Sequence, residues 1–76
     1  MSDDNVIDLF QRKIDKMSTQ ELFEETTRYG YIMERGNLTA QEKHEAKLIF
    51  ENALQRAETD EYKKVLRAAI RVLGYM

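Results

Sequence analysis

The side chains of this chain that are best arranged for chemistry lie in its last fifteen positions. Segment 62–76 contains no acidic residue and four basic ones, Lys63, Lys64, Arg67 and Arg71. At about 100° per residue in a helix, these four fall within one arc roughly 100° wide. Cationic groups arranged in this way can contact successive phosphates, and Tyr62 and Tyr75 at the ends of the segment could stack on unpaired bases. The pattern predicts a face that binds single-stranded or branched nucleic acid.

Two other uses of the four basic residues remain open. Positive side chains favour the C-terminal end of a helix, and these could pair with acids on earlier helices. They could also form a docking face for an acidic protein partner, so an adaptor or inhibitor of another enzyme is the alternative function. Residues 1–61 hold eight basic and fourteen acidic residues, whereas 62–76 hold four and none. We therefore expect a strong electrostatic dipole, although the formal net charge of −2 predicts no bulk attraction to nucleic acid.

Catalysis and metal binding have little support. Two acid pairs, Asp4/Asp8 and Glu21/Glu25, place carboxylates four residues apart on one helix face, a spacing as typical of a solvated surface as of an acid–base pair. His44 is the single histidine and the chain has no cysteine, which excludes the usual zinc arrangements. We expect no enzyme activity, catalytic residue, cofactor, metal or small-molecule substrate.

The elements that must position the basic residues are helices. The chain has no proline, three glycines, 34% charged residues and no alternating apolar pattern, which favours an all-α fold. Capping-box patterns begin helices at 18–21 (STQE) and 39–42 (TAQE), and Thr59 is an N-cap candidate. Gly36 is expected to end the second helix in a left-handed conformation, and Gly74 to end the last. These signals predict one domain, residues 1–76, folded as a small four-helix bundle with helices at 4–16, 19–35, 40–57 and 60–74.

Apolar positions repeat at helical spacing in each predicted helix. In the first helix the stripe begins at Val6, and in the second Gly30 is expected to allow close approach of another helix. The last helix has an apolar arc opposite its basic one: Val65, Leu66, Ala69, Val72, Leu73 and Met76. The predicted core includes Phe10, Ile14, Leu22, Tyr29, Met33, Ile49, Phe50, Ala53, Leu66, Ala69 and Leu73. A helix-turn-helix reading of the second and third helices is disfavoured, since the supposed recognition helix begins with acidic residues.

Size and location follow from the same sequence. A chain of 9.0 kDa should bury about 63% of its surface, so its stability is expected to be marginal. The N-terminal sequence MSDDNVIDLF lacks the pattern of a signal peptide, and no apolar run approaches a membrane span. We expect a cytoplasmic protein without membrane contact.

Taken end to end, from MSDDNVIDLFQRK through STQELFEETTRYGYIMERG to YKKVLRAAIRVLGYM, the chain resembles the family of small proteins encoded beside the UvsW recombination helicase of T-even bacteriophages. That resemblance implies a helical bundle similar to the HRDC module, the nucleic-acid-binding accessory domain of RecQ-type helicases. It also implies a role in phage DNA recombination or repair in the host cytoplasm, with a helicase or another recombination protein as partner. No binding motif of that module can be transferred residue by residue to this chain.

Overall fold

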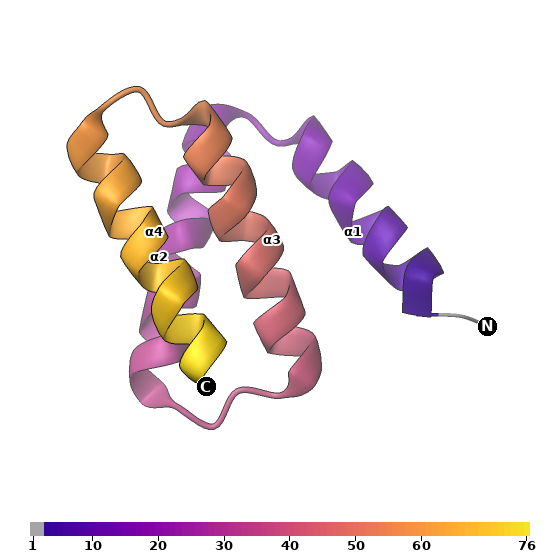
Figure 1. The fold of residues 1–76 in the computed structure, drawn as a ribbon. Coiled ribbons are helices and arrows are strands. Elements are labelled where there is room, and N and C mark those ends of the chain that lie inside the picture. The colour runs from indigo at the N-terminus through magenta and orange to yellow at the C-terminus, as the bar shows by residue number, and fades with distance from the viewer. Residues whose placement is uncertain (1–2) are drawn as a thin grey trace.

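The computed structural model of the protein (Figure 1) describes the backbone of residues 3–76 and the side chains of residues 9–76. That part of the chain contains four α-helices and no strand: α1 Asp3–Lys16, α2 Thr19–Arg35, α3 Ala40–Arg56 and α4 Asp60–Tyr75. The predicted all-α four-helix bundle is confirmed, with bounds within one residue of those expected. Gly74 does not end α4, which continues to Tyr75. No described helix has the length and apolar character needed to span a membrane. The side chains of Val6 and of the Asp4/Asp8 pair lie outside the described residues.

Side-chain caps begin three of the helices. Before α3 the capping box is complete, since the Glu42 N–H donates to Thr39 Oγ1 at 3.0 Å and the Thr39 N–H donates to Glu42 Oε1 at 2.9 Å. That hydrogen bond from the Thr39 backbone lowers the pKa of Glu42. Before α2 only half of the expected box forms, because the Glu21 N–H donates to Ser18 Oγ at 3.1 Å without a returning bond between these two residues. Thr59 Oγ1 caps α4, as predicted. The caps fix where α4 starts and therefore which positions carry its basic residues.

Gly36 ends α2 through backbone hydrogen bonds and a positive φ. Its N–H donates to the carbonyl oxygens of Ile32 and Met33 at 3.2 and 3.1 Å. The predicted positive φ is confirmed at +81°, but ψ of −175° places Gly36 in an extended region that essentially only glycine adopts. The left-handed region is instead occupied by Asn37, with φ of +58°. This turn reverses the chain, so that α3 packs antiparallel to α2.

The core lies where α2, α3 and α4 meet, and α3 contacts each of the other helices. Its buried apolar residues are Ile14, Leu22, Tyr29, Ala46, Ile49, Phe50, Ala53, Ala57, Leu66 and Leu73. Three residues expected in the core, Phe10, Met33 and Ala69, are only partly buried against it. Thr26 is buried as well and donates to the Phe23 carbonyl oxygen at 2.6 Å. The core is therefore built mainly from three helices.

Helix α1 leans away from α2 and α4 and docks on the outer side of α3 (Figure 1). The Arg56 guanidinium donates to the carbonyl oxygen of Met17 at 2.7 Å, just after α1 ends. Gln11 and Asn52 exchange side-chain hydrogen bonds at 3.2 and 3.3 Å. Ile14 is fully buried and is the anchor of α1 in the core. This placement leaves the outer face of α4 uncovered by α1.

Within the part of the chain that the structure describes, no other helix packs closely against Gly30, although the sequence predicted such an approach. A Cβ built at this position would meet no atom within 4 Å beyond its immediate surroundings. The prediction that another helix approaches closely there is wrong. Gly30 is thus a helix-interior glycine for which the described packing shows no steric need.

Candidate binding surface on the last helix

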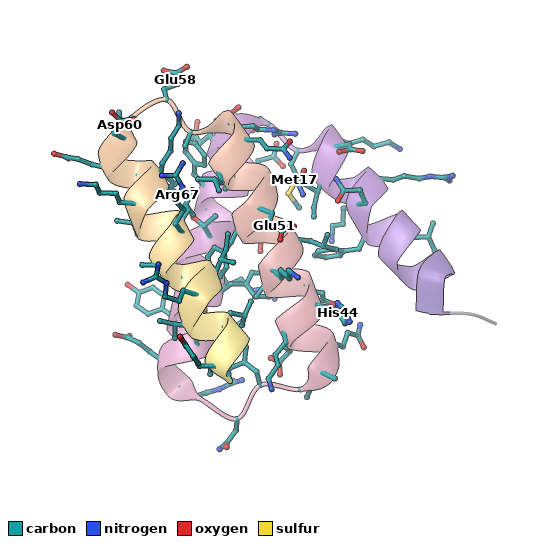
Figure 2. All side chains as sticks on the ribbon, in the orientation of Figure 1. Met17, His44, Glu51, Glu58, Asp60 and Arg67 are labelled. Carbon is teal, nitrogen blue, oxygen red and sulfur yellow. The ribbon has the colours of Figure 1, made fainter. Side chains whose placement is uncertain are left out.

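Three of the four basic side chains on α4 project into solvent. Lys64, Arg67 and Arg71 are exposed, whereas Lys63 is half-buried. Figure 2 labels Arg67 on α4 and Glu51 on the neighbouring helix α3. The acidic residues of α4, Asp60 and Glu61, are confined to its first turn, where they complement the helix dipole. The basic arc therefore lies beyond the acidic end of its own helix.

The basic arc makes no ion pair with any acid among the described side chains, residues 9–76. Among the described side chains, residues 9–76, the ion pairs join Arg28 to Glu25 at 3.4 Å and Arg35 to Glu42 at 3.5 Å. Neither pair includes a residue of α4. The alternative that these basic residues pair with acids on earlier helices is therefore wrong for the described side chains. Their charges remain available to a ligand.

The two tyrosines that flank the basic arc have different surroundings. The Tyr62 ring stacks on Phe23 with centroids 4.7 Å apart, and its hydroxyl lies 2.8 Å from Thr26 Oγ1. These contacts join α4 to α2 and cover one face of the ring, so Tyr62 has a structural role. Tyr75 is 85% exposed, as stacking on a base requires. The structure thus leaves Tyr75 as the free aromatic side chain of the predicted pair.

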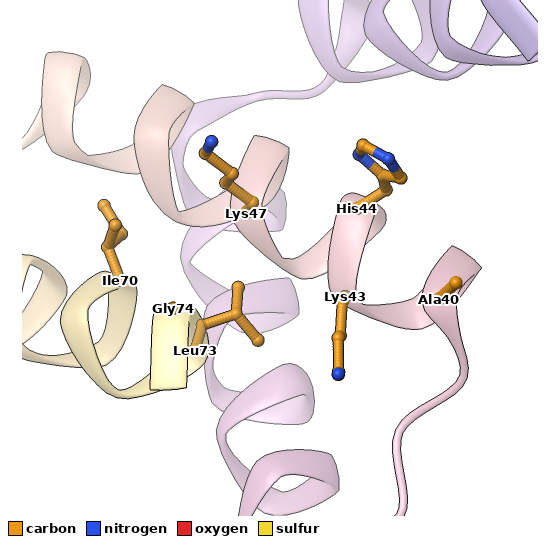
Figure 3. Close-up of a pocket in the computed structure, with 7 residues that line it drawn as sticks. All are labelled: Ala40, Lys43, His44, Lys47, Ile70, Leu73 and Gly74. Carbon is orange, nitrogen blue, oxygen red and sulfur yellow. The ribbon is translucent and has the colours of Figure 1, made fainter. Parts of the chain in front are cut away.

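A basic groove between α3 and α4 was missed by sequence reasoning. It has a volume of about 460 Å³, and seven residues line it (Figure 3): Ala40, Lys43, His44, Lys47, Ile70, Leu73 and Gly74. The Lys43 Nζ donates to the Met76 carbonyl oxygen at 2.6 Å and so ties the end of α4 to α3. Lys47 and His44 are exposed. The signal that could have found this groove is the antiparallel order of the two helices, which brings the start of α3 beside the end of α4.

The apolar arc predicted for α4 is only partly covered. Leu66 and Leu73 are buried, and Ala69 is partly buried. Val65 and Val72, which belong to the predicted apolar arc but not to the predicted core, are 65% and 52% exposed. The bundle covers a narrower sector of α4 than the apolar arc occupies. Exposed aliphatic side chains therefore lie beside the exposed basic ones.

Of the two acid pairs singled out in the sequence, the one with described side chains, Glu21/Glu25, does not form a reactive centre. Glu25 pairs with Arg28 on the next turn, and Glu21 is exposed at the start of α2. Burial raises the pKa of the Tyr29 hydroxyl, and its hydrogen bond to Glu45 at 2.7 Å raises that pKa further. This pair holds α2 against α3. No group of three acidic or histidine side chains among residues 9–76 is arranged to hold a metal.

The outside of α4 can therefore supply positive charge, one free aromatic ring and aliphatic surface, a combination suited to binding. No family model matches the chain, and searches of curated proteins and of solved structures found no match either. The function must accordingly be inferred from the residues of the chain itself.

Proposed function

We propose that the protein is a non-enzymatic accessory module that binds single-stranded or branched nucleic acid weakly through α4. The observation that carries this proposal is that Lys64, Arg67 and Arg71 are exposed and form no ion pair with another described side chain. A cation that is free of an internal partner can contact a phosphate without first breaking a bond within the protein. Neutralising phosphates releases condensed counterions, which supplies the favourable free energy.

The neighbouring residues support the same ligand. Lys47 is exposed on the α3 side of the basic groove, and Tyr75 is exposed near the end of α4. Phosphate contacts and one stacking side chain do not read base sequence, so binding should be largely independent of it. Contacts to about three phosphates would give a slope of log K against log salt of roughly −2 for a single strand.

The resemblance to the small proteins encoded beside a recombination helicase suggests the setting. Forked and single-stranded DNA are the substrates that such a setting supplies. We include in the proposal a role in phage DNA recombination or repair, beside a helicase or another recombination protein.

The test compares two variants with the same formal charge. One replaces Lys64, Arg67 and Arg71 by Gln, and its matched control replaces the exposed α1 residues Arg12, Lys13 and Lys16 by Gln. Fluorescence anisotropy with labelled single-stranded and forked DNA is measured at low and moderate salt. We expect the α4 variant to lose most of the affinity and most of the salt slope, and the α1 variant to retain both.

The expected contrast depends on position, because both variants change the net charge equally. Equal losses in the two variants would mean that net charge, and not α4, governs binding. Absence of binding by the unmodified protein at low salt would also overturn the proposal.

A further inference from the structure

The apolar arc of α4 is wider than the sector that the bundle covers. Counted from Lys63 at about 100° per residue, the buried Leu66 and Leu73 lie at roughly 300° and 280°. Four apolar residues lie on the solvent side, between roughly 120° and 200°. We call these four residues, Val65, Ala68, Val72 and Tyr75, the outer strip. All four are exposed in the structure.

The spacing of the outer strip is that of a helix-pairing surface. Steps of three, four and three residues correspond to positions a, d, a and d of a heptad repeat. From Val65 to Tyr75 the strip extends about 15 Å along the helix, nearly three turns. An exposed apolar strip of this kind is typical of a protein interaction site, whereas isolated exposed apolar residues are ordinary. The pattern therefore fits a second helix lying along α4.

The charges beside the outer strip specify the partner. In the same heptad register Lys64 and Arg71 occupy the g positions along one edge, and Ala69 and Met76 occupy the uncharged e positions along the other. The two basic residues lack ion pairs among the described side chains. In paired helices, charges at these positions select a partner of opposite charge.

We propose that the outer strip docks one amphipathic helix of another protein, with apolar residues at a and d and acidic residues at e and g. A second copy of this chain fits poorly. Antiparallel pairing of two outer strips would bring Lys64 and Arg71 of both copies together, and parallel pairing would place them opposite the uncharged e positions, with no partner of opposite charge. Nucleic acid does not account for the aliphatic members of the strip, Val65, Ala68 and Val72, because phosphates gain nothing from aliphatic side chains. This surface goes beyond the proposed nucleic-acid binding and does not depend on it.

The experiment uses two synthetic helical peptides of about four heptads, each with Leu at a and d. One has Glu at e and g, and the other has Lys. Binding to the whole protein is followed by fluorescence anisotropy and by amide chemical shifts. We expect the Glu peptide to bind at least about tenfold more tightly than the Lys peptide and to shift signals along α4.

Two single variants locate the contact. Val72→Gln removes an aliphatic side chain from the outer strip without changing the charge. It should weaken binding of the Glu peptide at least about tenfold. Leu9→Gln is the matched control, because Leu9 is also exposed but lies on α1; it should leave peptide binding unchanged. Neither variant should alter DNA affinity, which keeps this proposal distinguishable from the nucleic-acid one.

Equal binding of the two peptides, no binding by either, or equal loss in the two variants would overturn the docking proposal. So would sedimentation showing a dimer that Val72→Gln dissociates, because a second copy would then occupy the strip. Loss of DNA binding in Val72→Gln, with its fold retained by circular dichroism, would assign the strip to nucleic acid instead.

Discussion

At the scale of single residues, the contact between Tyr29 and Glu45 couples stability to alkaline pH. Burial, and then the hydrogen bond to the Glu45 carboxylate, raises the pKa of Tyr29 in the folded protein. The unfolded chain loses this proton above about pH 10, whereas the folded protein retains it. The folded state then binds more protons, so the stability from this group is complete below about pH 10 and falls as the pH rises further.

Tyr29→Phe should therefore flatten the alkaline loss of stability. At neutral pH we expect a cost of about 1 kcal/mol for the missing hydrogen bond. Above about pH 10 the free energy of unfolding should decline less steeply in the variant than in the unmodified protein. Urea denaturation across this pH range provides the measurement, with Tyr31→Phe as a control at an exposed tyrosine. Parallel declines in all three proteins would show that Tyr29 is not the responsible group.

At the scale of elements, a glycine inside α2 and the glycine that ends it should respond in opposite ways to substitution by alanine. Gly30 has open space where a Cβ would stand, so Gly30→Ala should stabilise the protein by about 0.5–1 kcal/mol through helix propensity. Gly36 also has open space, but its φ of +81° and ψ of −175° suit glycine alone. Gly36→Ala should consequently cost about 1–3 kcal/mol. Chemical denaturation of both variants measures whether the free energy of unfolding rises in Gly30→Ala and falls in Gly36→Ala. A destabilised Gly30→Ala would reveal packing at Gly30 that the structure does not show.

The helix bounds were predictable because the signals that set them are local. Thr39 and Thr59 reach backbone N–H groups three residues ahead, a distance fixed by the chain itself. The exposure of Val65 was not predictable, since it depends on how much of α4 the other helices cover. The same applies to Tyr62, which meets Phe23 only through tertiary packing. Sequence periodicity located the basic arc. The groove that includes Lys43 could not be located in the same way, because its lining comes from two helices whose contact the sequence does not specify.

At the scale of the whole molecule, the protein is less compact than its size suggests. Its accessible surface is 5710 Å², against roughly 4,800 Å² from area scaling for 9.0 kDa. The Cα radius of gyration is 12.2 Å, and a compact chain of this length would have about 11.4 Å. A helix that leans away from the rest of the bundle, as α1 does (Figure 1), raises both measures. With less surface buried than expected, each core side chain contributes a larger share of the stability.

Phe50→Ala tests that dependence directly. Phe50 is 2% exposed on α3, the helix that contacts all the others. Truncation removes its buried ring and leaves a cavity, at a cost of about 3–5 kcal/mol. A core of this size supplies only about 3–5 kcal/mol of net stability, so most molecules of the variant should unfold. Leu9→Ala, at an exposed position on α1, is the control and should melt close to the unmodified protein. Circular dichroism melts decide the outcome, since a Phe50→Ala protein that melts within a few degrees of the parent would show that the fold does not depend on this ring.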